Sequence, residues 1–102
     1  MKKYRQGDVL IVSTDNIPGN PEPEKKLPHL TLAKGEVTGH AHKITEGDAE
    51  LYEHEGTLFL KVISEEALLS HEEHLPILLP RGNYEIKIQK EYEPGGWRKV
   101  SD

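Results

Sequence analysis

The 102-residue sequence contains no cysteine. This absence excludes disulfide frameworks, thiolate metal sites and cysteine nucleophiles, so any metal ion must be held by nitrogen and oxygen ligands. Long apolar runs are also lacking, and none approaches the roughly 18 residues of a membrane span. The basic N-terminus is followed by a short apolar stretch, Val9 to Ser13, which is too short for a signal peptide. A cytoplasmic location is therefore the expectation.

Positive charge is in deficit, with 13 Lys and Arg against 18 Asp and Glu and a net charge of −5. The composition thus provides no general attraction to nucleic-acid phosphates. Basic and aromatic residues nevertheless gather near both ends of the sequence, at Lys2, Lys3, Tyr4, Arg5, Trp97, Arg98 and Lys99. A nucleic-acid-associated accessory protein using these residues is one alternative, against which the acidic balance argues.

The length predicts one folded domain, residues 1–102, and the hydrophobic fraction of 34% predicts a thin core. Residues 16–28 contain four prolines, which neither a helix nor a central strand accepts, so this segment is expected to be a surface loop. We find no internal repeat and no low-complexity tract.

Short segments of β character follow one another closely, and no helical period lasts three turns. Glu55-Gly56 separates two apolar segments and predicts a hairpin. Ser70 and Glu73 have the spacing of a helix capping box, but Pro76 limits that helix to about one turn. The sequence therefore predicts an all-β barrel or roll of seven or eight short strands with at most one short helical turn. The expected strands lie within Gly7–Ser13, Leu30–Ile44, Leu51–Glu53, Thr57–Val62, Ala67–Leu69, Ile77–Leu79, Asn83–Tyr92 and Trp97–Val100.

The densest chemistry is in two histidine pairs. On an extended segment His40 and His42 project from the same face, together with Thr38 and Ile44, and can bind one ion together. His71 and His74 are three residues apart, so they lie on the same side of a helical turn, where Glu72 and Glu73 add carboxylates. A β-roll would bring both pairs around one cavity, giving a shared metal site.

Each pair also has a simpler interpretation. His40 and His42 are compatible with an exposed polar strand face, and the segment from His71 to His74 with a solvated charged turn. In the segment from His71 to His74 the two histidines are one residue closer together than in the zinc-protease motif His-Glu-x-x-His, so the sequence excludes a zinc protease of that class. His29 and His54 are expected at the surface.

The segment from Gly35 through His40, His42 and Glu46 resembles the first motif of the cupin superfamily, although the glycine precedes the first histidine by five positions instead of six. Pro80-Arg81-Gly82 resembles the second motif, but the position of its histidine ligand holds Glu85. The resemblance implies a small, often dimeric β-barrel that holds Fe, Mn, Zn or Ni. It makes Glu46 a ligand and leaves His71, His74 or Glu85 to complete the set.

The leading functional hypothesis is a cupin-like metal-binding protein, which as an enzyme would take a small-molecule ligand. A divalent ion with open coordination positions would polarise a substrate oxygen or activate water or dioxygen. The pattern identifies no catalytic residue. The alternative is a non-catalytic interaction module, in which the histidines form a polar or pH-sensitive surface and edge strands pair into a homodimer. The predicted metal ligands are His40, His42, Glu46, His71 and His74.

Overall fold

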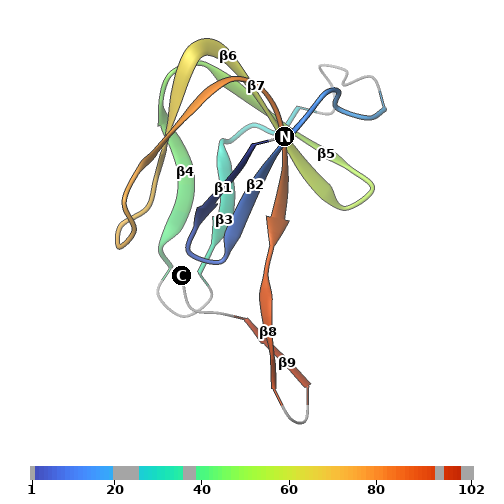
Figure 1. Cartoon of the computed structure of the whole chain (residues 1–102), viewed down its shortest axis with the longest axis vertical. Coiled ribbons are helices and arrows are strands. Elements are labelled where there is room, and N and C mark those ends of the chain that lie inside the picture. The colour runs from blue at the N-terminus through green and yellow to red at the C-terminus, as the bar shows by residue number, and fades with distance from the viewer. Residues whose placement is uncertain (1, 20–25, 36–38, 94–95, 100–102) are drawn as a thin grey trace.

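A computed structural model describes residues 2–19, 26–35, 39–93 and 96–99, and over these ranges the chain is built from β-strands without a helix (Figure 1). The all-β prediction is confirmed. No helix in these ranges is long and apolar enough to cross a membrane. The strands are β1 (Lys3–Gln6), β2 (Val9–Thr14), β3 (Thr31–Lys34), β4 (Ala41–Glu46), β5 (Ala49–His54), β6 (Thr57–Ser70), β7 (Ile77–Ile88), β8 (Lys90–Glu93) and β9 (Gly96–Lys99).

Seven strands form one antiparallel sheet, in which six follow the order β1-β2-β7-β6-β4-β3 and β5 pairs with β6 off this path. β7 pairs along one edge of β6, whereas the other edge of β6 pairs first with β5 and then with β4. No pairing joins the edge strands β1 and β3 within the described ranges, so the sheet is open and the expected closed barrel is not formed. β8 and β9 make a separate two-stranded hairpin.

The tight β5–β6 hairpin follows from the residues at its turn. Glu55 has a φ of 50° and Gly56 a φ of 80°. Two central residues with positive φ form the turn whose twist matches that of antiparallel strands. The hairpin predicted from Glu55-Gly56 is confirmed, with His54 opposite Thr57 and Leu51 opposite Leu60.

β6 and β7 are longer than the sequence suggested, at 14 and 12 residues. The apolar segments expected as separate strands are joined within them. The register between the two strands shifts between Val62 and Glu66, and Figure 1 shows both strands arching across the molecule. Such irregularities bend a strand pair and increase its twist. The two halves of the β6–β7 strand pair therefore belong to different parts of the sheet.

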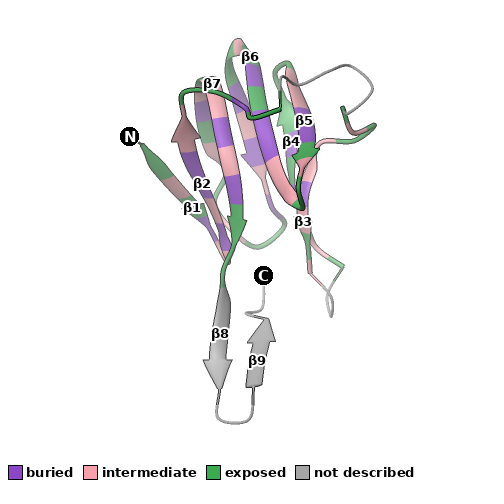
Figure 2. Ribbon diagram, turned by 90° about the vertical axis from the view of Figure 1, so that its right-hand side faces the viewer, coloured by how far each residue is buried: buried purple, intermediate pink, exposed green. Residues whose placement is uncertain are grey.

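The core lies on the inner face of the curved sheet, and buried positions alternate with exposed ones along its strands (Figure 2). Tyr84 and Ile86, which alternate with polar residues along β7, are buried, whereas Ile88 is 40% exposed at the end of this strand. The main cluster contains Val9, Ile11, Leu32, Ile44, Leu51, Leu60, Val62, Ala67, Leu69, Leu79, Tyr84 and Ile86.

The proline-rich segment is only partly within the described ranges, because residues 20–25 lie outside them. Ile17, at the start of this segment, is buried with Tyr52 and Phe59 in a second small cluster. Lys26, at the far end, forms an isolated β-bridge with Tyr52. Both described ends of the predicted surface loop are thus held against β5.

The helical turn predicted after Ser70 is wrong. Ser70 is the last residue of β6, and its hydroxyl is 2.7 Å from the Thr45 hydroxyl of β4, so it does not cap a helix. Residues 71–76 instead form a bent connection between β6 and β7. Ser70 pairs with Lys43 of β4, so the residue that would cap the helix is held in the sheet.

Candidate metal centre

Three connections meet around the predicted histidines: the β1–β2 turn, the residues before β4, and the β6–β7 connection. The ring centroid of His71 lies 4.2 Å from that of His42, 4.6 Å from that of His74 and 5.7 Å from that of His40. His40, His42, His71 and His74 are hereafter called the histidine cluster. The structure therefore brings together the two histidine pairs that are 31 residues apart in the sequence, from His40 to His71.

His42 is the most deeply placed member of the cluster. It lies inside β4, where His42 and Ile44 are buried and Lys43 between them is exposed. Its side chain is 1% exposed. Burying an imidazole costs free energy unless its nitrogens find polar partners. Its Nδ1 lies 2.9 Å from Oε1 of the buried Gln6 on β1.

The orientation of the Gln6 amide fixes the tautomer of His42. The Nε2 amide group donates to the carbonyl oxygens of Leu69, at 3.1 Å, and Leu75, at 2.9 Å. Since a flipped amide would point its oxygen at these two carbonyls, Oε1 must face His42 as an acceptor. His42 Nδ1 therefore carries the proton, and the lone pair of neutral His42 is on Nε2. A histidine that binds metal usually donates its other ring N–H in this way.

His71 and His74 come from the β6–β7 connection. His71 is buried, and its Nδ1 accepts the backbone N–H of Glu73 at 3.0 Å, so this nitrogen carries a lone pair. An ion can take this lone pair in exchange for the N–H. His74 Nε2 is buried and has no hydrogen-bond partner among the described residues. An imidazole nitrogen in that state is available as a ligand.

Glu72 supplies a carboxylate at the outer side of the cluster. The backbone N–H of Ala41 donates to it at 3.0 Å, and this hydrogen bond lowers the pKa of the Glu72 carboxyl below its ordinary value. The carboxylate is thus held in its charged form beside the start of β4. One ligand atom from each of His40, His71 and Glu72 lies within 4.8 Å of the other two. His40 Nδ1 is also 3.6 Å from the Glu73 carboxylate.

The other residues considered from the sequence lie elsewhere. Glu46 is exposed at the end of β4, about 13 Å along the strand from His42 at the usual rise per residue. Glu85 pairs with Phe59 in the first half of β6, whereas His71 follows the second half. His29 is exposed and His54 is half-buried. Thr38 lies outside the described residues, as do the side chains of Trp97, Arg98 and Lys99.

Sequence reasoning missed the β1–β2 turn. Gln6 orients His42, and the Asp8 carboxylate oxygen Oδ1 lies 3.6 Å from His42 Nε2. In the sequence, Gly7 and Asp8 are only the first residues of the expected strand Gly7–Ser13. Nothing in their local pattern points to the histidines, because 33 residues separate Gly7 from His40.

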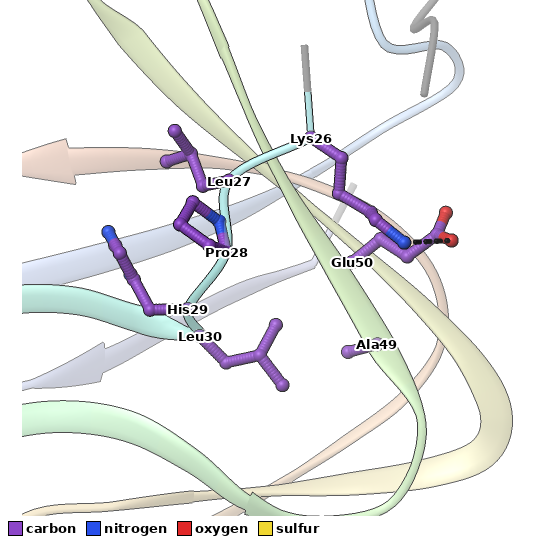
Figure 3. A pocket seen from close by; sticks show the side chains of 7 residues that line it. All are labelled: Lys26, Leu27, Pro28, His29, Leu30, Ala49 and Glu50. Carbon is purple, nitrogen blue, oxygen red and sulfur yellow. Dashed lines mark ion pairs between the residues drawn. The ribbon is translucent and has the colours of Figure 1, made fainter. Parts of the chain in front are cut away.

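A groove of about 290 Å³ lies beside β5, and none of the histidine cluster lines it (Figure 3). Lys26 and Glu50 form an ion pair at 3.7 Å at its rim. Figure 3 shows these two side chains pointing toward each other. The groove is lined by Lys26, Leu27, Pro28, His29, Leu30, Ala49 and Glu50.

The Tyr52 hydroxyl donates a hydrogen bond to the Glu50 carboxylate at 2.7 Å. This hydrogen bond is the main cause, and burial the second cause, that raises the pKa of Tyr52 to about 12. A raised pKa favours the protonated phenol in the folded state, so its contribution to stability is complete below pH 10 and is lost as pH rises toward 12. We expect Glu50→Gln to lower the Tyr52 pKa toward 10. The phenolate absorbance at 295 nm, compared with Tyr52→Phe to assign the transition, measures this. An unchanged pKa in Glu50→Gln would contradict the assigned cause.

Comparison with known families overturns one expectation. The model of a family described as a domain of unknown function, DUF8820, matches residues 5–89. No curated protein and no solved structure matches the chain significantly. The cupin resemblance is wrong, since no cupin family matches. Its two short motifs do not assemble one site here, because the stretch Pro80 to Gly82 lies in the middle of β7 and Glu46 lies apart from the cluster.

Proposed function

Because the chain belongs to DUF8820, a family whose description assigns no activity, we propose from the geometry that it binds a divalent transition-metal ion at the histidine cluster. The observation that carries this proposal is the set of His40, His71 and Glu72, whose ligand atoms lie within 4.8 Å of one another. They adjoin His42 and His74. Imidazole nitrogens with one carboxylate suit Zn, Fe, Ni or Mn.

The state of the ring nitrogens supports this proposal over a polar core. Neutral His42 has its lone pair on Nε2, His71 has one on Nδ1, and His74 Nε2 is buried without a hydrogen-bond partner among the described residues. In a network that served only the fold, the buried Nε2 of His74 would face a hydrogen-bond donor. Lone pairs gathered in one place are instead what a cation requires.

The bound ion would act as a Lewis acid. With Glu72 and His40 partly solvent-exposed, the outer side of the cluster leaves coordination positions for water or for an oxygen of a small-molecule ligand.

The test is a titration of metal-free protein with Zn²⁺, Mn²⁺ and Ni²⁺ by isothermal calorimetry. We expect wild-type protein to bind at least one ion per chain. His40→Ala and Glu72→Gln should each weaken binding about 10-fold or more, on the scale seen for residues around metal sites. Both positions are partly or fully exposed, and glutamine keeps an acceptor for the Ala41 N–H, so the fold should survive.

The matched controls are His29→Ala and Glu65→Gln, which remove the same groups from exposed positions outside the cluster. They should bind like wild type. If wild-type protein binds no ion, or if the controls lose as much affinity as the cluster variants, the proposal fails. A non-catalytic homo-oligomeric module, pairing through edge strand β1 or β3, would then be the better hypothesis, and sedimentation analysis would test it.

A further inference from the structure

The β1–β2 turn, Gly7 and Asp8, lies against the histidine cluster. Gln6, the last residue of β1 before this turn, is 2% exposed and bonds to His42 and to the carbonyls of Leu69 and Leu75. At the other end of the turn the carbonyl oxygen of Asp8 accepts the Gln89 N–H at 2.8 Å. Both ends of the turn are thus anchored, and its middle is held against the cluster.

Gly7 permits this close approach. It has a φ of 60°, which a glycine adopts without strain. A Cβ at this position would lie 2.7 Å from His74 Nε2 and 3.3 Å from His42 Cε1. The backbone of the turn therefore packs directly on His42 and His74, and the carboxylate of the next residue, Asp8, lies 3.6 Å from His42 Nε2.

When His42 is neutral, the Asp8 carboxylate faces a ring nitrogen that accepts hydrogen bonds and cannot donate one. Gln6 holds the proton of neutral His42 on Nδ1, so the Nε2 lone pair faces Asp8 Oδ1 at 3.6 Å. A lone pair and a carboxylate repel at this distance unless a positive charge lies between them. Two ligands of one tetrahedral ion, at metal–ligand distances of 2.0–2.2 Å, are separated by about 3.4 Å. The observed spacing fits that arrangement.

We propose that Asp8 is a ligand of the ion at the histidine cluster and that its carboxylate sets the site's preference among metals. The inference rests on the proposed metal binding. With Asp8 and His42 bound to the same ion, the carboxylate takes the place of a further nitrogen ligand. Carboxylate oxygen favours Mn²⁺, whereas imidazole favours Ni²⁺.

The test compares Mn²⁺ and Ni²⁺ affinities of wild type, Asp8→Asn and Asp8→Glu by calorimetry. Asp8→Asn should weaken Mn²⁺ binding about 10-fold or more, and Ni²⁺ binding by a smaller factor, because the anionic carboxylate becomes a neutral amide while every imidazole ligand stays in place. Asp8→Glu should restore part of the Mn²⁺ affinity. Asp15→Asn, which removes an exposed carboxylate at the other end of β2, should match wild type for both ions. Urea unfolding of each variant checks the fold.

Three results would overturn the inference. Asp8→Asn could bind both ions like wild type, which would make the carboxylate a bystander. It could instead lose both affinities by the same factor, which would give Asp8 a structural role only, such as pairing with a protonated His42. Wild-type protein that binds neither of these ions, nor Zn²⁺, would remove the proposed function along with the inference, whereas the first two results leave the metal binding of the wild-type protein unaffected.

Discussion

Truncation of Leu60 to alanine is expected to lower the free energy of unfolding by about 2–5 kcal/mol, the range for large buried aliphatic residues. Leu60 is fully buried in β6, between Leu51 of β5 and Tyr84 of β7. Strands on both sides would lose their contacts with it, and the strand pairing leaves little freedom to close the cavity. Urea unfolding followed by circular dichroism measures the change.

Leu75→Ala is the matched control. Leu75 is 87% exposed on the β6–β7 connection, so the same truncation there should change stability by no more than about 0.5 kcal/mol. Equal losses in the two variants would show that Leu60 is not at the centre of the core described above.

Gln6→Met is expected to cost about 2–4 kcal/mol in metal-free protein. Methionine has a similar length but leaves the carbonyls of Leu69 and Leu75 without their donor and His42 Nδ1 without its acceptor. Buried polar groups left unpaired carry the full cost of desolvation. Urea unfolding measures the loss, and ¹⁵N NMR of the histidine rings should show that His42 no longer has a single tautomer.

Gln89→Met makes the same substitution at an exposed position just after β7. It should leave both stability and the His42 spectrum unchanged. If Gln6→Met were equally harmless, or if His42 kept its proton on Nδ1, the amide would not be the group that orients His42, and this part of the site's construction would be wrong.

Local features of the fold were predictable because their causes are local. Glu55-Gly56 has the positive φ values that a tight hairpin needs, and Tyr84 and Ile86 alternate with polar residues along a strand. The prediction after Ser70 failed because pairing with β4 and β7 overrode a local capping pattern. Likewise, the joining of Val62 to Ala67 in one long strand depends on pairing with β7, which no short window of sequence contains.

By itself, the sequence determined an all-β chain without thiolate chemistry and the two local histidine pairs, because composition and strand alternation act over a few residues. The tertiary structure decided that the pairs meet, and that Gln6 and Asp8 join them across 36 and 34 residues to His42. The physical reason is the bend of β6 and β7 at their register shift. It curls the sheet until the β1–β2 turn reaches the β6–β7 connection. That contact is set by the packing of the whole sheet.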